Sequence, residues 1–469
     1  MTIIGLFVFS IIPLIILCGL LIWSRGRGNR LRTIILGATV IHETLLVIFP
    51  SIYSIFTDFE LEGRMLAAVT PTDMLLVMIG ESVFVLMFSF ALTIGIPNFS
   101  LRGRGLKFIF FGEITKRIER AILNFLIVAG IFIYAPKLFS AALNVENGLA
   151  EDIGWYLTGV FWYMPLVVCS FLITRRKEFS TNFVRFFLAI IPLISLVVIG
   201  ITSGVRGRII WAISLLLVAG IFNRQKKIIA ICLTVAILFL PIFAVLGDRD
   251  TRGAMASSIT SRSEIYTLVY EAGIENISNS SEMMKAFLES FSWRAQGVRN
   301  SAVLYKDFDH GGGGFKTYLG APFALIPRGV WPEKPMLGSL DHTEFESAMY
   351  KVMLMGHGEP GTMGPLLASA HAYWEGGWIW LVVAGLITGI FWNAVFRYCR
   401  KLPDIIAAVI TLSFAAALIN DGLLTMLTPL YAFIIRFWLS LLPLLCIYIG
   451  MRLINLASAY PAPARGTEN

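Results

Sequence analysis

Charged residues are scarce in this 469-residue sequence: they make up 14% of it, whereas a water-soluble domain carries about 25%. Hydrophobic residues make up 57%, and the mean hydropathy is +0.76. This balance excludes a water-soluble globular domain. Since much of the basic charge lies in short loops between apolar runs, we attribute the net charge of +8 to membrane topology and not to nucleic-acid binding.

Cysteine is also rare, and it never occurs as a CxxC pair. All five cysteines lie in or next to apolar runs, which excludes a disulfide framework and predicts small buried apolar side chains: Cys18, Cys169, Cys232, Cys399 and Cys446. The five histidines do not form a metal-binding pattern either, since "DHTEFE" at 341–346 lacks the spacing of HExxH. We therefore expect no metal and no other cofactor.

Long apolar runs are abundant, and runs of about 18 residues or more can span a bilayer as helices. The sequence predicts an all-α polytopic membrane protein with about eleven transmembrane helices. The expected spans are 3–23, 34–56, 73–95, 121–142, 154–174, 183–203, 205–223, 227–247, 377–396, 404–420 and 430–451. No basic stretch precedes the first span and "SRGRGNRLR" follows it, so we expect no cleavable signal peptide.

Loop charges alternate along the chain, because every second loop is basic. Clusters of Arg and Lys follow the first, third, fifth, seventh and ninth spans, whereas acidic residues follow the second and fourth. The positive-inside rule therefore puts the N-terminus outside and the C-terminus inside. Three regions follow: an N-terminal transmembrane bundle (1–247), one large extracytoplasmic loop subdomain with interfacial helices (248–376), and C-terminal transmembrane helices with a cytoplasmic tail (377–469).

Basic residues on the outer side oppose this rule and are candidates for binding a phosphate group. In "SGVRGRII", Arg206 begins the seventh span and Arg208 follows, at an outer helix N-terminus that favours anions. Arg436 lies inside the last span, and Arg328 and Lys334 lie in the Pro-rich segment "APFALIPRGVWPEKP". The alternatives are snorkelling to lipid headgroups, an ion pair of Arg436 with a neighbouring aspartate, and a plain membrane anchor.

Candidate general bases lie where the outer loop returns to the membrane, at His357, His371 and Glu375. The alternative for His371 is simple packing against neighbouring aromatic residues. Three further ionisable residues, His42, Glu43 and Glu81, lie within the second and third spans. They are compatible with a proton pathway or with interhelical pairs.

Three stretches carry a resemblance to a known family: "SGVRGRII", "FALIPRGVWPEKP" and "GPLLASAHAYWEGGW". With the many-helix layout and the large late loop, they resemble bacterial O-antigen and related repeat-unit polymerases of the Wzy type. One departure is His371, because the family often has an acidic residue before the Ala-Tyr pair.

The resemblance implies a GT-C-like glycosyltransferase of the bacterial inner membrane that works without a metal. It would join undecaprenyl-diphosphate-linked oligosaccharide repeat units into O-antigen or exopolysaccharide, with its active site facing the periplasm or exterior. Expected partners are the lipid-linked donor and acceptor, membrane lipids and a chain-length regulator protein. The alternatives are an O-antigen ligase, which uses the same donor, and a flippase or transporter of lipid-linked glycan.

Overall fold

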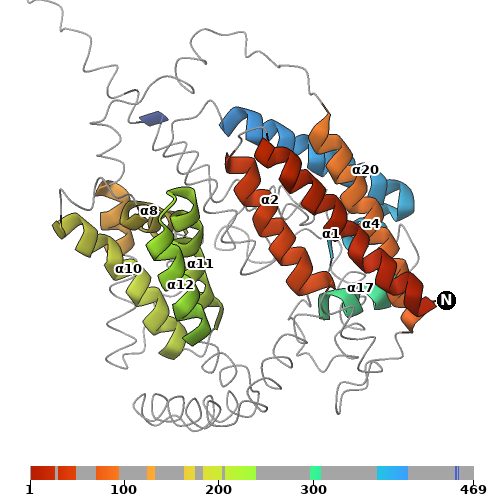
Figure 1. Ribbon diagram of the computed structural model, residues 1–469, viewed down its shortest axis with the longest axis horizontal. Coiled ribbons are helices and arrows are strands. Elements are labelled where there is room, and N and C mark those ends of the chain that lie inside the picture. The colour runs from red at the N-terminus through yellow and green to blue at the C-terminus, as the bar shows by residue number, and fades with distance from the viewer. Residues whose placement is uncertain are drawn as a thin grey trace, which may run out of the picture.

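The computed structural model describes residues 2–26, 30–48, 70–94, 124–132, 163–174, 183–202, 206–238, 296–307 and 367–399, together with residues 449, 450 and 453. These residues are almost entirely helical and contain no strand, in agreement with the predicted all-α class (Figure 1). The principal helices are α1 (Thr2–Gly26), α2 (Arg30–Glu43), α4 (Pro71–Thr93), α8 (Tyr163–Thr174), α10 (Phe183–Thr202), α11 (Arg206–Phe222), α12 (Lys226–Leu238), α17 (Gln296–Asp307) and α20 (Ala368–Cys399). A π-helical turn, η1 (Thr44–Ile48), continues α2.

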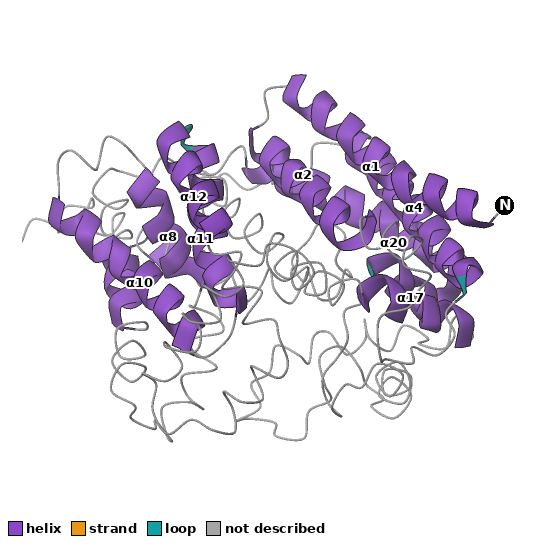
Figure 2. Cartoon of the chain, turned by 60° about the horizontal axis from the view of Figure 1, so that its bottom comes forward, coloured by secondary structure: helices purple, strands orange, loops and turns teal. Residues whose placement is uncertain are grey.

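A first group of helices is built around α4, which packs against both α1 and α20 (Figure 1). The short helix α17 comes from the predicted outer loop and contacts α4, α20 and η1. In two views, α17 lies at the end of this group that carries the N-terminus (Figures 1 and 2). A second group contains α8, α10, α11 and α12, in which α11 contacts the other three helices.

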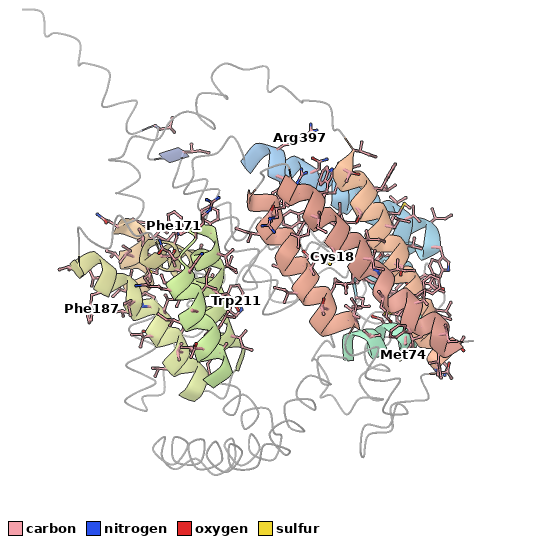
Figure 3. The ribbon with its side chains drawn as sticks, viewed as in Figure 1. Cys18, Met74, Phe171, Phe187, Trp211 and Arg397 are labelled. Carbon is pink, nitrogen blue, oxygen red and sulfur yellow. The ribbon has the colours of Figure 1, made fainter. Side chains whose placement is uncertain are left out.

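Helices α1 and α4 are parallel. Near their starts, Gly5 faces the side chain of Leu75, and further along the Ser82 hydroxyl donates to the Phe9 carbonyl at 3.1 Å. Met74, at the start of α4, and Arg397, near the end of α20, are labelled at opposite ends of the group (Figure 3). The alternation of loop charges predicts this common direction for the first, third and ninth spans.

Two glycines one helical turn apart bring α20 against α4. A Cβ atom on Gly385 would lie 2.9 Å from the carbonyl oxygen of Phe84, and one on Gly389 would collide with the carbonyl oxygen of Phe88. This Gly-x-x-x-Gly spacing lets two membrane helices approach at backbone distance. Because positions 385 and 389 meet positions 84 and 88 in the same order, α4 and α20 are also parallel.

The basic helix ends lie together, as the loop charges predict. The Arg32 guanidinium lies over the rings of Trp23 and Phe396, at 5.1 and 5.3 Å, and so joins the start of α2 to the ends of α1 and α20. In the second group, Asn223 Nδ2 donates to Thr174 Oγ1 at 2.7 Å, which joins the end of α11 to the end of α8. Within each group, these helix ends therefore lie together as the loop charges predict.

Asn393 closes the C-terminal end of α4. Its side-chain amide donates to the carbonyls of Leu92 and Ile94 at 3.0 and 2.7 Å. The last carbonyls of a helix have no partner within the helix, so the amide of Asn393 supplies donors that a membrane does not offer.

Replacement of Asn393 with leucine is expected to destabilise the protein by about 1–2 kcal/mol, because it removes both donors and keeps a similar volume. Thermal unfolding of the purified protein in detergent measures this effect. Thr93→Val is the matched control at the same helix end, since the Thr93 hydroxyl donates only to Phe90 of its own helix in an exposed position. Equal melting temperatures for the two variants would contradict the assigned role.

Three of the described helices are long and apolar enough to cross a membrane: Ile3–Gly26, Pro71–Thr93 and Ala368–Arg397. Large apolar side chains on them face outward, with Ile22 73% and Ile379 82% exposed, as suits a lipid environment. Shorter apolar helices cover Phe187–Val198 and Ile209–Phe222. The predicted spans 404–420 and 430–451 lie outside the described residues except at 449 and 450, so the total of about eleven helices stays a prediction.

Candidate functional site

The first turns of α20 form a separate segment, Ala368–Glu375, which ends at a kink. At the kink Gly376 has φ −159° and ψ 24°, and Gly377 has φ 68° and ψ −162°. The conformation of Gly377 is open almost exclusively to glycine. The sequence predicts a span from position 377, whereas the helical segment begins at Ala368, inside the predicted loop. The kink thus lets a polar segment of the predicted loop pack against α4 and α17.

His371 and Glu375 lie together on this segment. They are one helical turn apart, and their atoms Nε2 and Oε1 approach to 3.9 Å, farther than a hydrogen bond. Both side chains are buried, His371 at 2% and Glu375 at 0% exposure. The His371 ring also contacts the edge of Trp374, with ring centroids 6.0 Å apart. An imidazole beside a carboxyl group can accept a proton while the carboxylate stabilises the resulting imidazolium.

Glu81 of α4 is joined to the same segment. The Ser369 hydroxyl donates to Glu81 Oε2 at 2.5 Å and so joins residues far apart in the chain. Glu43, the last residue of α2, carries a second buried carboxyl group. Glu81 is 1% exposed and Glu43 is 2% exposed. Helices α4 and α20 therefore bring a carboxyl group and a hydroxyl group together in a buried region.

Helix α17 covers this region. The Leu367 amide, just before α20, donates to Ser301 Oγ at 3.1 Å, so α17 caps the start of α20. Tyr305 stacks on Tyr373 with ring centroids 4.1 Å apart, and its hydroxyl lies against Gly80, next to Glu81. Burial raises the pKa of Tyr305 well above its ordinary value, and the Glu81 carboxyl adds to this effect. The phenol therefore stays protonated at neutral pH and can donate a hydrogen bond.

Of the predicted site residues, the structure brings together His371 and Glu375. Arg206 is the first residue of α11, as predicted, and Arg208 lies in its first turn, but their side chains lie outside the described part of the structure. The remaining predicted residues also lie outside it: His357, Arg328, Lys334 and Arg436. Within the described residues, no group of three or more His, Cys, Asp or Glu could hold a metal ion.

Sequence reasoning singled out Glu43 and Glu81 but did not connect them to the segment that carries His371. The signal was their position inside apolar helices, where an ionisable residue needs a partner. It did not identify Ser369 or Tyr305, because a serine in a small-residue stretch and a tyrosine in a polar loop are unremarkable in the sequence. Their role comes only from the packing of α17 and α20 on α4.

Three of the cysteines predicted to be buried can be compared with the structure, and one of them, Cys18 of α1, is only partly buried. Cys169 of α8 and Cys232 of α12 are both buried free thiols, in agreement with the expectation of small apolar side chains. Comparison with protein-family models, with curated proteins and with solved structures finds no match to this chain.

Proposed function

We propose that this protein is a membrane glycosyltransferase that joins undecaprenyl-diphosphate-linked oligosaccharide repeat units into a surface polysaccharide, O-antigen or exopolysaccharide. The observation that carries the proposal is the buried pair of His371 and Glu375 on a kinked segment of α20. The same segment lies in the stretch that resembles the Wzy-type polymerases. A GT-C-like architecture with a large extracytoplasmic loop belongs to the proposal.

The reaction forms a glycosidic C–O bond and breaks the bond between the anomeric carbon and the diphosphate of the donor. In the proposed mechanism His371 accepts the proton of the attacking acceptor hydroxyl, and Glu375 stabilises the charged imidazole. The lipid diphosphate leaves with the electron pair of the broken bond. Such a displacement needs no metal if fixed cations meet the negative charge of the leaving group. His357 is an alternative base.

Arg206 is the proposed first contact for that diphosphate. It begins α11 at the helix end opposite Asn223, and Asn223 lies at the basic end shared with α8. The helix N-terminus offers backbone N–H groups to the same anion. The proposal includes Arg208 beside it and three residues from later segments: Arg328, Lys334 and Arg436. We propose that this end faces the periplasm or exterior of a bacterial inner membrane.

Arg206→Lys is expected to lose most of the polymer while the protein still inserts in normal amounts. Lysine keeps the positive charge but lacks the planar guanidinium that holds two phosphate oxygens at once. Polymer length and yield in cells carrying the variant measure the effect. Arg224→Lys, just past the other end of α11, is the matched control and should leave the polymer unchanged. Normal polymer in the Arg206 variant would remove this residue from the proposed site.

A deletion strain distinguishes the proposed function from its two rivals. Loss of the polymerase leaves single repeat units attached to the lipid A-core or its equivalent. Loss of a ligase leaves no attached glycan, although polymer still accumulates on its lipid carrier. Loss of a flippase traps lipid-linked repeats on the inner leaflet. The proposal is supported by the first outcome, and either of the other two contradicts it.

A further inference from the structure

We propose that Glu81 is a positioning residue. Through its hydrogen bond to Ser369 it fixes the first turns of α20, Ala368–Glu375, and thereby holds His371 where the proposed reaction needs a base. The role of His371 rests on the proposed function, whereas the attachment of the segment to α4 can be tested without any reaction. A break in α20, the contacts that precede it and the geometry of the helix support this role.

Helix α20 is interrupted between this segment and the part that packs closely on α4. Gly376 and Gly377 have non-helical backbone angles, whereas the close approach to α4 occurs further along, at Gly385 and Gly389. Because the regular helix stops at the kink, the packing beyond it does not by itself set the direction of the segment. The segment therefore needs attachments of its own.

The segment is attached both to α4 and to α17. The Ser369 hydroxyl donates to Glu81 Oε2 at 2.5 Å. On α17, Ser301 accepts from the backbone amide just before the segment at 3.1 Å, and Tyr305 stacks on Tyr373. The bond to Glu81 joins the segment to α4, which is long and apolar enough to span a membrane, whereas α17 belongs to the predicted loop.

Helix geometry separates the attached face of the segment from the face that carries the proposed base. Successive residues of an α-helix are about 100° apart, so positions four apart share a face and positions two apart lie on nearly opposite sides. Ser369 and Tyr373 are four apart and contact α4 and α17. His371 and Glu375 lie on the other face, with Nε2 and Oε1 3.9 Å apart. The bond to Glu81 thus fixes the rotation of the segment, and with it the direction of His371.

A glutamate at this position is costly, which favours a specific role. Glu81 is 1% exposed and lies within an apolar helix, where an ionisable group is unfavourable unless it has a partner. The close contacts at Gly385 and Gly389 already join α4 to α20, so the two helices do not need the carboxyl group to stay together. Its hydrogen bond instead serves the segment before the kink.

Glu81→Leu in the purified full-length protein removes the acceptor and keeps a similar volume. Hydrogen exchange resolved by peptide should become faster at residues 368–375, with little change in α20 beyond the kink. With a defined lipid-linked repeat unit, kcat should fall about 10- to 100-fold while KM stays within a few-fold, as expected for a misplaced catalytic group. Glu81→Gln keeps an acceptor oxygen and should restore most of the turnover lost in Glu81→Leu.

Ser369→Ala should reproduce the effect of Glu81→Leu from the other partner of the hydrogen bond. The double variant should be no slower than the slower single variant, because both changes remove the same interaction. Ser82→Ala is the matched control on α4, since the Ser82 hydroxyl donates to the carbonyls of Phe9 and Met78. It should leave the exchange of the segment unchanged and the turnover within a few-fold.

A normal kcat in Glu81→Leu would overturn the proposal, and so would losses that add in the double variant. A loss in Glu81→Gln as large as in Glu81→Leu would assign the effect to the charge of the carboxyl group and would also contradict it. If the unchanged protein makes no glycan, the proposed function fails, but the exchange measurement still tests the attachment. Unchanged exchange at 368–375 in both Glu81→Leu and Ser369→Ala would show that Glu81 does not hold the segment.

Discussion

Gly389→Ala is expected to lower the stability of the protein by about 1–3 kcal/mol, and Gly389→Val by more. The added Cβ would collide with the Phe88 carbonyl and would lie 2.7 Å from the Ala91 Cβ and 3.1 Å from the Leu92 amide nitrogen. These are mostly backbone neighbours, which cannot rotate away as a long side chain can. The helices α4 and α20 would have to separate, and the Ser369–Glu81 contact would be weakened with them.

Thermal unfolding in detergent, with the folded yield from size-exclusion chromatography, measures this loss. Gly19→Ala is the matched control, because Gly19 is also inside a membrane helix and a Cβ there meets nothing within 4 Å. We expect this control to be neutral or slightly stabilising, since alanine is the better helix former. A Gly389→Ala variant as stable as Gly19→Ala would show that α4 and α20 do not pack at backbone distance.

His371→Gln is expected to reduce turnover by about 100- to 10,000-fold while the lipid-linked donor still binds, which is the size of effect expected for losing a general base. Glutamine keeps a polar side chain at the same place but cannot take up the proton at neutral pH. The effect is measured with purified protein and a defined lipid-linked repeat unit. Donor binding is measured separately on the same preparation.

The matched control is His42→Gln on α2, a partly buried histidine outside the proposed catalytic pair. It should leave turnover within a few-fold of the unchanged protein. Near-normal turnover of the His371 variant would leave Glu375 or His357 as the base. A parallel loss of donor binding would instead indicate that His371 supports the structure of the α20 segment.

The relative directions of the helices could be predicted from the sequence, because basic residues gather at one end of alternate spans. Arg32 meeting Phe396, and Asn223 meeting Thr174, agree with that prediction. The helix starts also agree within a few residues for α1, α4, α10 and α11. This success has a simple origin, since span length and loop charge are local properties of the sequence.

The start of α20 could not be predicted in the same way. Its first segment contains His371 and Glu375, which lower the apolar signal, so the expected span began only at position 377. In the structure α17 packs against this segment, through Ser301 with Leu367 and through Tyr305 with Tyr373. Contact with a neighbouring helix does not depend on the hydropathy by which a membrane span is recognised. The contact between Ser369 and Glu81 joins residues far apart in the sequence, and no local pattern encodes it.

The kink at Gly377 joins the segment Ala368–Glu375 to the rest of α20. Two consecutive glycines after Glu375 were visible in the sequence, but glycine pairs occur in many membrane helices without a kink. The positive φ of Gly377 turns the polar segment toward α4, whereas the rest of α20 packs through Gly385 and Gly389. His371 and Glu375 are thus carried by a helix that packs closely on α4, and they lie at the end predicted to face outward.

Synthesis by the purified protein tests the central proposal most directly. The protein is supplied with one defined repeat unit on undecaprenyl diphosphate, with no nucleotide sugar, no added metal and no other enzyme. The proposal predicts products with two or more repeat units on one lipid, and one lipid diphosphate released for each new glycosidic bond. Repeat units that stay single, or that move only to an added lipid A-core acceptor, would contradict it.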